Sequence, residues 1–109
     1  MYFVKFSMEL VLEKREKRLF EMGKIVVTRG LLGLMEKDEG FVIFVRESLE
    51  KHSKGIWGDL SSSDKFDNEL SLDQGFRLLS AYTQENFPRI WIITEGDRIA
   101  TTVPFPEEY

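Results

Sequence analysis

The sequence predicts an α+β fold, in which an N-terminal strand and two to three helices pack on an antiparallel sheet with a C-terminal three-stranded meander. Two patterns predict it: apolar residues recur at helical spacing through the middle of the chain, and apolar and polar residues alternate through residues 77–109. A length of 109 residues suits one hydrophobic core. We therefore expect a single α+β domain over residues 22–109, preceded by an N-terminal amphipathic helical extension over residues 1–21.

The N-terminal half contains the patterns of a helix, a strand and two further helices. Residues 8–22 have an apolar stripe typical of an amphipathic helix, and the β-branched segment 23–28 favours a strand. Thr28 is positioned to cap a brief helix over residues 29–37. A second helix is predicted at about residues 40–54. Its apolar stripe consists of Phe41, Phe44, Val45, Ser48, Leu49 and His52.

A third helix is predicted within the segment SSSDKFDNELSLDQG, residues 61–75. Its serines and Asp64 can supply the N-cap, and Gly75 is a stop signal. Phe66 and Leu70 are spaced to share one face of this helix, and we expect that face to join the core.

Three strands are predicted after this helix, at residues 76–83, 89–95 and 98–105. The Gly-Asp dipeptide between the last two strands is typical of a two-residue hairpin loop with glycine first. Such a loop pairs Glu95 with Arg98 and thereby fixes the register of the last hairpin.

Three charged residues, Arg77, Glu95 and Arg98, lie inside this alternating pattern. If Thr83 pairs with Arg89, Arg77 falls beside Glu95, and the three charges form one row across three strands, here called the charged row. Opposite charges paired across strands stabilise a sheet by about 0.2–1 kcal/mol each, and we favour this structural interpretation. The alternative is an anion site, because each guanidinium is a planar fork suited to phosphate.

Metal and cofactor chemistry is not indicated by the residue types. His52 is the only histidine and there is no cysteine, which excludes disulfides, thiolate ligands and multi-histidine metal sites. The sequence has no calcium-loop pattern, glycine-rich phosphate loop or dinucleotide fingerprint, so we expect no metal and no cofactor. We expect His52 to pack near its helix C-terminus rather than to act as a general acid or base.

The loop GIWGDL, residues 55–60, is a candidate contact surface through Trp57 and Asp59. Trp57 lies between two glycines, and we expect it to plug the loop with its N–H bonded to a carbonyl. An aromatic side chain held by glycines can also be an interaction hot spot. Trp91, in the alternating region, is expected in the core against a helix.

The C-terminal segment VPFPEEY combines two prolines, which favour an extended chain, with an acidic tip. Glu107, Glu108 and Tyr109 form this tip, and Tyr109 can serve as an aromatic anchor. We favour a tail that folds back on its own domain over an exposed tail that binds a basic partner.

The charge balance and the apolar runs restrict the partners. With 19 acidic and 15 basic residues the net charge is −4, which disfavours nucleic acid as a partner. No apolar run approaches the roughly 20 residues needed to span a bilayer, and the N-terminus lacks the pattern of a signal peptide. We expect a cytoplasmic protein without membrane association.

The segments GIWGDLSSSDKFDNELSLDQGFRLLSAYT, IWIITEGDRIATTV and PEEY occur in this order, and with them the sequence resembles a family of small bacterial proteins described as plasmid-related. The resemblance covers residues 22–109. It implies a gene carried on plasmids or integrated elements, and it implies no reaction.

Two functions follow as hypotheses. The favoured one is a non-enzymatic interaction protein of a mobile genetic element, which binds a protein partner or forms a homodimer. The alternative is a metal-independent ribonuclease or toxin, because the order of elements resembles RelE/ParE-like toxins and, more loosely, barnase-like ribonucleases. That alternative would use His52, Arg77, Glu95, Arg98 and Thr102 around a scissile phosphate.

Overall fold

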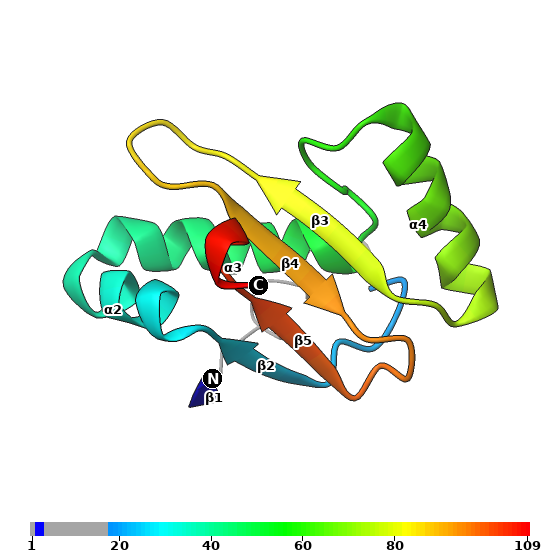
Figure 1. Cartoon of the computed structure of the whole chain (residues 1–109), viewed down its shortest axis with the longest axis horizontal. Coiled ribbons are helices and arrows are strands. Elements are labelled where there is room, and N and C mark those ends of the chain that lie inside the picture. The colour runs from blue at the N-terminus through cyan, green and yellow to red at the C-terminus, as the bar shows by residue number, and fades with distance from the viewer. Residues whose placement is uncertain (1, 4–17) are drawn as a thin grey trace.

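The structure is a computed structural model, which describes residues 2–3 and 18–109. Its strands are β1 (Tyr2–Phe3), β2 (Lys24–Val27), β3 (Leu78–Tyr82), β4 (Ile90–Thr94) and β5 (Ala100–Val103), and its helices are α2 (Arg29–Lys37), α3 (Glu39–Ser53), α4 (Ser62–Gln74) and the 3₁₀ helix η1 (Pro106–Glu108). The strands form a mixed sheet in the order β1-β2-β5-β4-β3 (Figure 1). Neighbouring strands are antiparallel except β2 and β5, which are parallel. The predicted α+β class and its C-terminal meander are confirmed.

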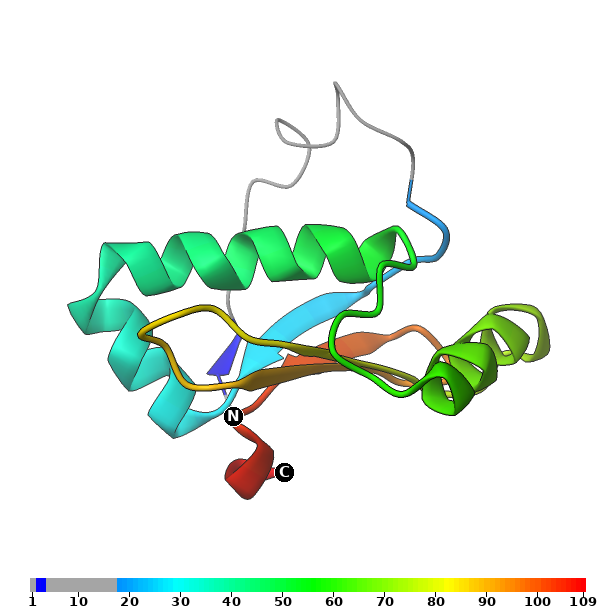
Figure 2. The ribbon, with the colours of Figure 1, turned by 90° about the horizontal axis from the view of Figure 1, so that it is seen from above.

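The helix α3 and the sheet form the two main layers. Figure 2 shows α3 along one face of the sheet and η1 on the opposite face, while α4 stands beside the edge formed by β3. We call the face toward α3, which carries Ile92 and Val103, the inner face, and the opposite face, which carries Trp91 and Thr102, the outer face. The core cluster consists of Met22, Ile25, Val27, Leu31, Phe41, Phe44, Val45, Leu49, Tyr82, Ile90, Ile92 and Val103.

The helix α3 follows its predicted pattern. Every residue of the predicted stripe is buried, from Phe41 to His52. The Asp38 side chain caps the helix by accepting a hydrogen bond from the Phe41 N–H (3.2 Å). Gly55 follows the helix with a φ of 75°, the left-handed conformation that glycine adopts without steric cost.

The predicted N-terminal helix is not found in the part of it that the structure describes. Residues 8–17 lie outside the described residues, and residues 18–22 contain no helix. Instead, the Leu19 N–H donates to the Ser53 carbonyl (2.8 Å) and Met22 is buried in the core. This segment therefore belongs to the packed domain.

The β3–β4 pair has the predicted register. Leu78 lies opposite Thr94. The same register, continued by one residue, brings Arg77 beside Glu95, as the charged row requires.

The β4–β5 register differs from the prediction by two residues. Ile93 lies opposite Thr102, whereas a two-residue loop would set it opposite Ala100. The Glu95 N–H donates to the Ala100 carbonyl (3.1 Å), and Arg98 sits in the loop with a φ of 62°. Because the shift is an even number of residues, each side chain keeps its predicted face.

The edge of β3 that has no neighbouring strand is hydrogen-bonded to other parts of the domain. The Asn68 amide donates to the Leu79 carbonyl (2.6 Å) and accepts from the Leu79 N–H (3.1 Å). Two residues along, the Asp59 N–H donates to the Ala81 carbonyl (2.7 Å), and Gly58 forms a bridge with Ala81. A Cβ on Gly58 would lie 1.9 Å from the Ala81 oxygen, so only glycine fits there. These contacts satisfy the backbone groups that an edge strand leaves free.

The predicted core stripe of α4 is wrong. Ser61 caps this helix, accepting from the Asp64 N–H, and Gly75 ends it, as expected. Phe66 is 62 % and Leu70 47 % exposed, however, whereas the buried residues of α4 are Asn68 and Ser71. The helix is therefore turned with its polar face toward the sheet.

Candidate functional site

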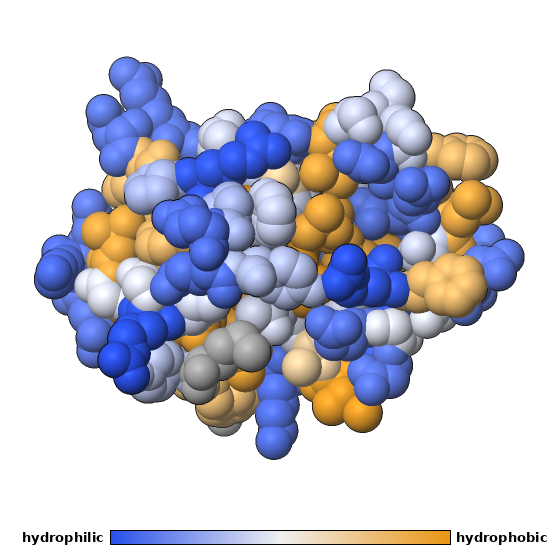
Figure 3. All heavy atoms as spheres, viewed as in Figure 1, coloured by the Kyte–Doolittle hydropathy of each residue, from blue (hydrophilic) through white to orange (hydrophobic). Residues whose placement is uncertain are grey.

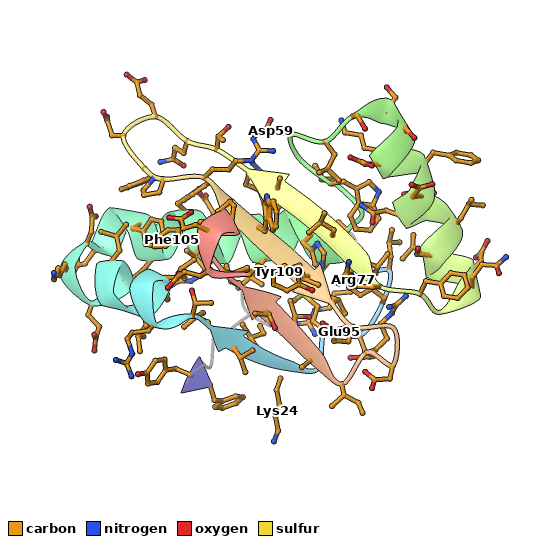
Figure 4. All side chains as sticks on the ribbon, viewed as in Figure 1. Lys24, Asp59, Arg77, Glu95, Phe105 and Tyr109 are labelled. Carbon is orange, nitrogen blue, oxygen red and sulfur yellow. The ribbon has the colours of Figure 1, made fainter. Side chains whose placement is uncertain are left out.

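Arg77 does not pair with Glu95. Its Nη1 donates to the hydroxyl of Tyr109 (2.6 Å), and its guanidinium carbon lies 5.7 Å from the centre of that ring. The Tyr109 ring in turn packs edge-on against Trp91, with 6.1 Å between the ring centres. Figure 4 shows Arg77 and Tyr109 together over the outer face. Trp91 therefore packs against the C-terminal tail and not, as predicted, against a helix in the core.

Arg98 clamps three backbone carbonyls. Its Nη1 donates to the carbonyls of Phe76 (2.7 Å) and Glu95 (3.0 Å), and its Nη2 donates to that of Ser71 (3.1 Å). The same guanidinium lies over the ring of Phe20, 5.6 Å from its centre. Arg98 thereby ties the end of α4 to the β4–β5 hairpin.

The charged row is therefore not formed. In the described part of the chain, neither arginine makes an ion pair with Glu95; the ion pair found there joins Lys54 to Glu50 (3.2 Å). The two guanidinium groups also diverge, since Arg77 binds the tail and Arg98 binds carbonyls. The predicted ladder of charge pairs is wrong, and the two guanidinium groups of the alternative anion site are bonded to different partners, Tyr109 and backbone carbonyls.

The C-terminal tail folds back on the domain, as predicted. Thr28 Oγ1 donates to Glu108 Oε1, and the Gly30 N–H donates to Glu108 Oε2 (2.9 Å). Glu108 thus caps the start of α2, where the side chain of Thr28 makes no cap bond itself. The hydrogen bond from Thr28 lowers the pKa of Glu108 below its ordinary value. The neighbouring Glu107 is exposed to solvent.

His52 is fully buried in a chain of hydrogen bonds between α3 and the sheet. Thr101 Oγ1 donates to the Met22 carbonyl (2.7 Å) and accepts from Thr94 Oγ1 (2.7 Å). Thr94 then accepts from His52 Nε2 (2.9 Å), and His52 Nδ1 accepts from Ser80 Oγ (2.5 Å). The Met22 carbonyl can only accept, so the direction of every hydrogen bond in this series is fixed. The proton of the neutral imidazole is therefore assigned to Nε2.

The same environment keeps the imidazole neutral. Burial, with a smaller contribution from the positive charge of Arg98, lowers the pKa of His52 to about 3. A buried Ser–His pair without a path to solvent has no access to substrate. His52 is therefore a packing residue, in agreement with the favoured interpretation of the sequence.

The loop at residues 55–60 holds its aromatic side chain inside. Trp57 is 4 % exposed, and its Nε1–H donates to a carboxylate, that of Glu69 (2.7 Å), rather than to the predicted carbonyl. Its ring stacks with Phe20 at 6.3 Å. The Asp59 side chain accepts from the Thr83 hydroxyl (2.6 Å). Trp57 is the plug that the sequence favoured, and its ring is not available to a partner.

The residues of the ribonuclease hypothesis do not converge. His52 lies under the inner face, while Arg77 lies over the outer face. Thr102 points to the outer face because neighbouring strand residues alternate, and Thr101 points inward to the His52 chain. Arg98 and Glu95 lie at the β4–β5 hairpin. No cleft of the described residues brings a base, an acid and an anion site together.

The surface that the sequence did not indicate is the outward face of α4. Phe66 and Leu70, here called the α4 apolar pair, point away from the domain, and Phe76, just after the helix, is 60 % exposed. Figure 3 shows apolar side chains along the rim of the molecule over α4. The spacing of Phe66 and Leu70 predicted one shared face, but spacing alone does not tell whether that face points inward.

Comparison with known proteins identifies no relative: no family model, curated protein or solved structure matches the chain. Within residues 2–3 and 18–109, no three histidine or acidic side chains are grouped as metal ligands would be. Over the same residues, every helix is too short or too polar to cross a membrane.

Proposed function

We propose that this protein acts as a non-enzymatic cytoplasmic accessory protein that binds another protein through α4. The resemblance to plasmid-related proteins extends the proposal to a role on a mobile genetic element. The observation that carries it is the orientation of α4, which buries Asn68 and Ser71 and exposes Phe66 and Leu70.

Solvent exposure of the α4 apolar pair is unfavourable for an isolated domain. Burying a Phe or Leu side chain contributes about 1.5–3 kcal/mol, so removing the exposed parts of Phe66 and Leu70 from water would contribute roughly 1–2 kcal/mol each. Two large apolar residues four positions apart also form the anchor pattern by which amphipathic helices bind grooves. A partner that covers this face gains that free energy at no cost to the fold.

Polar contacts on the inner side of α4 hold it against the domain. Asn68 binds the edge of β3, Glu69 binds Trp57, and the Ser71 carbonyl binds Arg98. Because these contacts fix the helix before a partner arrives, binding does not have to order it. This preorganisation favours a docking element over a helix that is merely peripheral.

The test is the native mass of the protein in extracts of cells that carry the gene. The 12.8 kDa chain is expected to elute in a larger complex, and Phe66→Ser with Leu70→Ser is expected to return it to its own mass. The matched control is Ile43→Ser, since Ile43 is 50 % exposed on α3 and a general loss of surface hydrophobicity would affect it equally. A wild-type protein that elutes alone, or a complex that the α4 variant leaves intact, would contradict the proposal.

A further inference from the structure

We infer that the partner of α4 is a different protein with an apolar groove bordered by basic side chains, and that α4 enters this groove as a helix. This inference rests on the proposed function and names the chemistry of the partner. It depends on the negative net charge of α4.

The helix that carries the α4 apolar pair is strongly acidic. Its sequence SSDKFDNELSLDQ contains four acids, Asp64, Asp67, Glu69 and Asp73, and one base, Lys65, so its net charge is −3. Asp67 lies three residues before Leu70 and Asp73 three residues after it, so both carboxylates are one helical turn from Leu70 and border the α4 apolar pair. All four acids are exposed.

These charges disfavour a second copy of this protein as the partner of α4. A symmetric dimer would place α4 against α4 and bring two helices of −3 charge together. Like charges placed against one another at an interface are strongly unfavourable. The same acidic border repels the phosphates of nucleic acids and of anionic lipid headgroups.

A groove with apolar walls and basic borders fits both the α4 apolar pair and the carboxylates beside it. Its walls would cover Phe66 and Leu70, and its lysine or arginine side chains would face Asp67 and Asp73. Phe76, exposed beyond the end of the helix, would extend the apolar contact. Charges at the border of an interface mainly speed association and suppress wrong partners. Because salt screens such exposed charges, binding would be weaker at high salt.

The first experiment identifies the partner by photo-crosslinking in cells that carry the gene. The photoreactive amino acid p-benzoylphenylalanine replaces Phe66 in the full chain, and in the control chain it replaces Ile43, which is also exposed. We expect an adduct from position 66 alone, joined to a distinct protein at an apolar site flanked by lysine or arginine. A crosslink to a second copy or to nucleic acid, or equal adducts from position 43, would overturn the inference. If no adduct forms at position 66, both the inference and the proposed function fail.

The second experiment measures the affinity of the purified protein for the identified partner by calorimetry. Asp67→Lys with Asp73→Lys should weaken binding by about tenfold, while the control Glu36→Lys with Glu85→Lys, which changes the same number of exposed acids elsewhere, should change it less than about twofold. Binding should also weaken as salt rises. If Phe66→Ser abolishes binding but both charge-reversed variants bind alike, the basic border is refuted while the proposed function stands.

Discussion

His52 shows how one buried residue acquires a pH-dependent effect on stability. Its imidazole is neutral because it is removed from water and its two nitrogens are engaged by Ser80 and Thr94. In the unfolded chain the pKa returns to the ordinary value of 6.5, while in the folded chain it is about 3. Between these two values, the unfolded state binds a proton that the folded state does not.

We predict that the protein loses stability as the pH falls below 6.5. The contribution of His52 is fully present above that value and declines toward pH 3, because protons then favour the unfolded state. Between pH 7 and pH 5 the free energy of unfolding should fall by about 2 kcal/mol from this residue alone. Urea unfolding at the two pH values measures the change.

The control for this prediction is His52→Gln, which retains a polar side chain and cannot titrate. Its absolute stability is expected to be lower, since the hydrogen bonds to Ser80 and Thr94 are disturbed. The fall between pH 7 and pH 5 should nevertheless shrink by about 2 kcal/mol relative to wild type. An equal fall in both proteins would mean that the imidazole is not shielded in the folded state.

At the scale of elements, α4 reverses the usual relation between polarity and stability. At the edge of β3, the side-chain amide of Asn68 makes the two hydrogen bonds to Leu79 that the backbone of a neighbouring strand would otherwise make. The apolar pair on the opposite side contributes little to the fold, because Phe66 and Leu70 stay largely in water. Asn68 therefore stabilises the domain more than Phe66 and Leu70 do.

We predict that Asn68→Ala destabilises the protein by about 1–3 kcal/mol, since it leaves the Leu79 N–H and carbonyl without partners. Phe66→Ala should change the free energy of unfolding by less than about 0.5 kcal/mol, which is usual for surface substitutions. The midpoint of urea unfolding compares the two variants. A larger loss for Phe66→Ala than for Asn68→Ala would show that α4 packs with its apolar face inward.

The elements also show what the sequence can and cannot tell. The apolar stripe located α3, and the cap signals at Ser61 and Gly75 located α4, because a cap acts through neighbouring backbone atoms. The orientation of α4 depends on a tertiary contact with β3, formed between Asn68 and Leu79, which helical periodicity does not reveal. The β4–β5 loop was mispredicted because Arg98, rather than a glycine, adopts the left-handed conformation, and three carbonyls hold its side chain there.

At the scale of the whole molecule, the C-terminal tail with η1 covers part of the outer face of the sheet, and no α-helix of residues 18–109 lies on that face. Tyr109 rests on Trp91, and Glu108 is bonded to Thr28 and Gly30 at the start of α2. The tail thus links β5, β4 and α2. The sequence predicts that the tail folds back on the domain, and it names the tail residues as a candidate site. It does not predict the hydrogen-bond partners of Glu108, because Thr28 and Gly30 lie 80 and 78 residues away in the chain.

We predict that deleting residues 106–109 lowers the melting temperature and exposes Trp91. The change removes the cap on α2, and a lost cap costs about 0.5–2 kcal/mol, which corresponds to a fall of several degrees. Trp91 emission should shift to longer wavelength, measured in a Trp57→Phe background so that one indole reports. Glu107→Gln is the control, because Glu107 is exposed and caps no helix. An unchanged spectrum in the deletion variant would show that the tail does not cover Trp91.

The position of β5 has a consequence for the synthesis of the protein. β5 is the last of the strands in chain order, yet it lies between β2 and β4 in the middle of the sheet. While the ribosome is still translating it, β2 has no partner on that side and the β3–β4 hairpin has no second neighbour. The sheet can close only after residues 100–103 have emerged, so a nascent chain that stalls before them exposes two unpaired strand edges to chaperones and proteases.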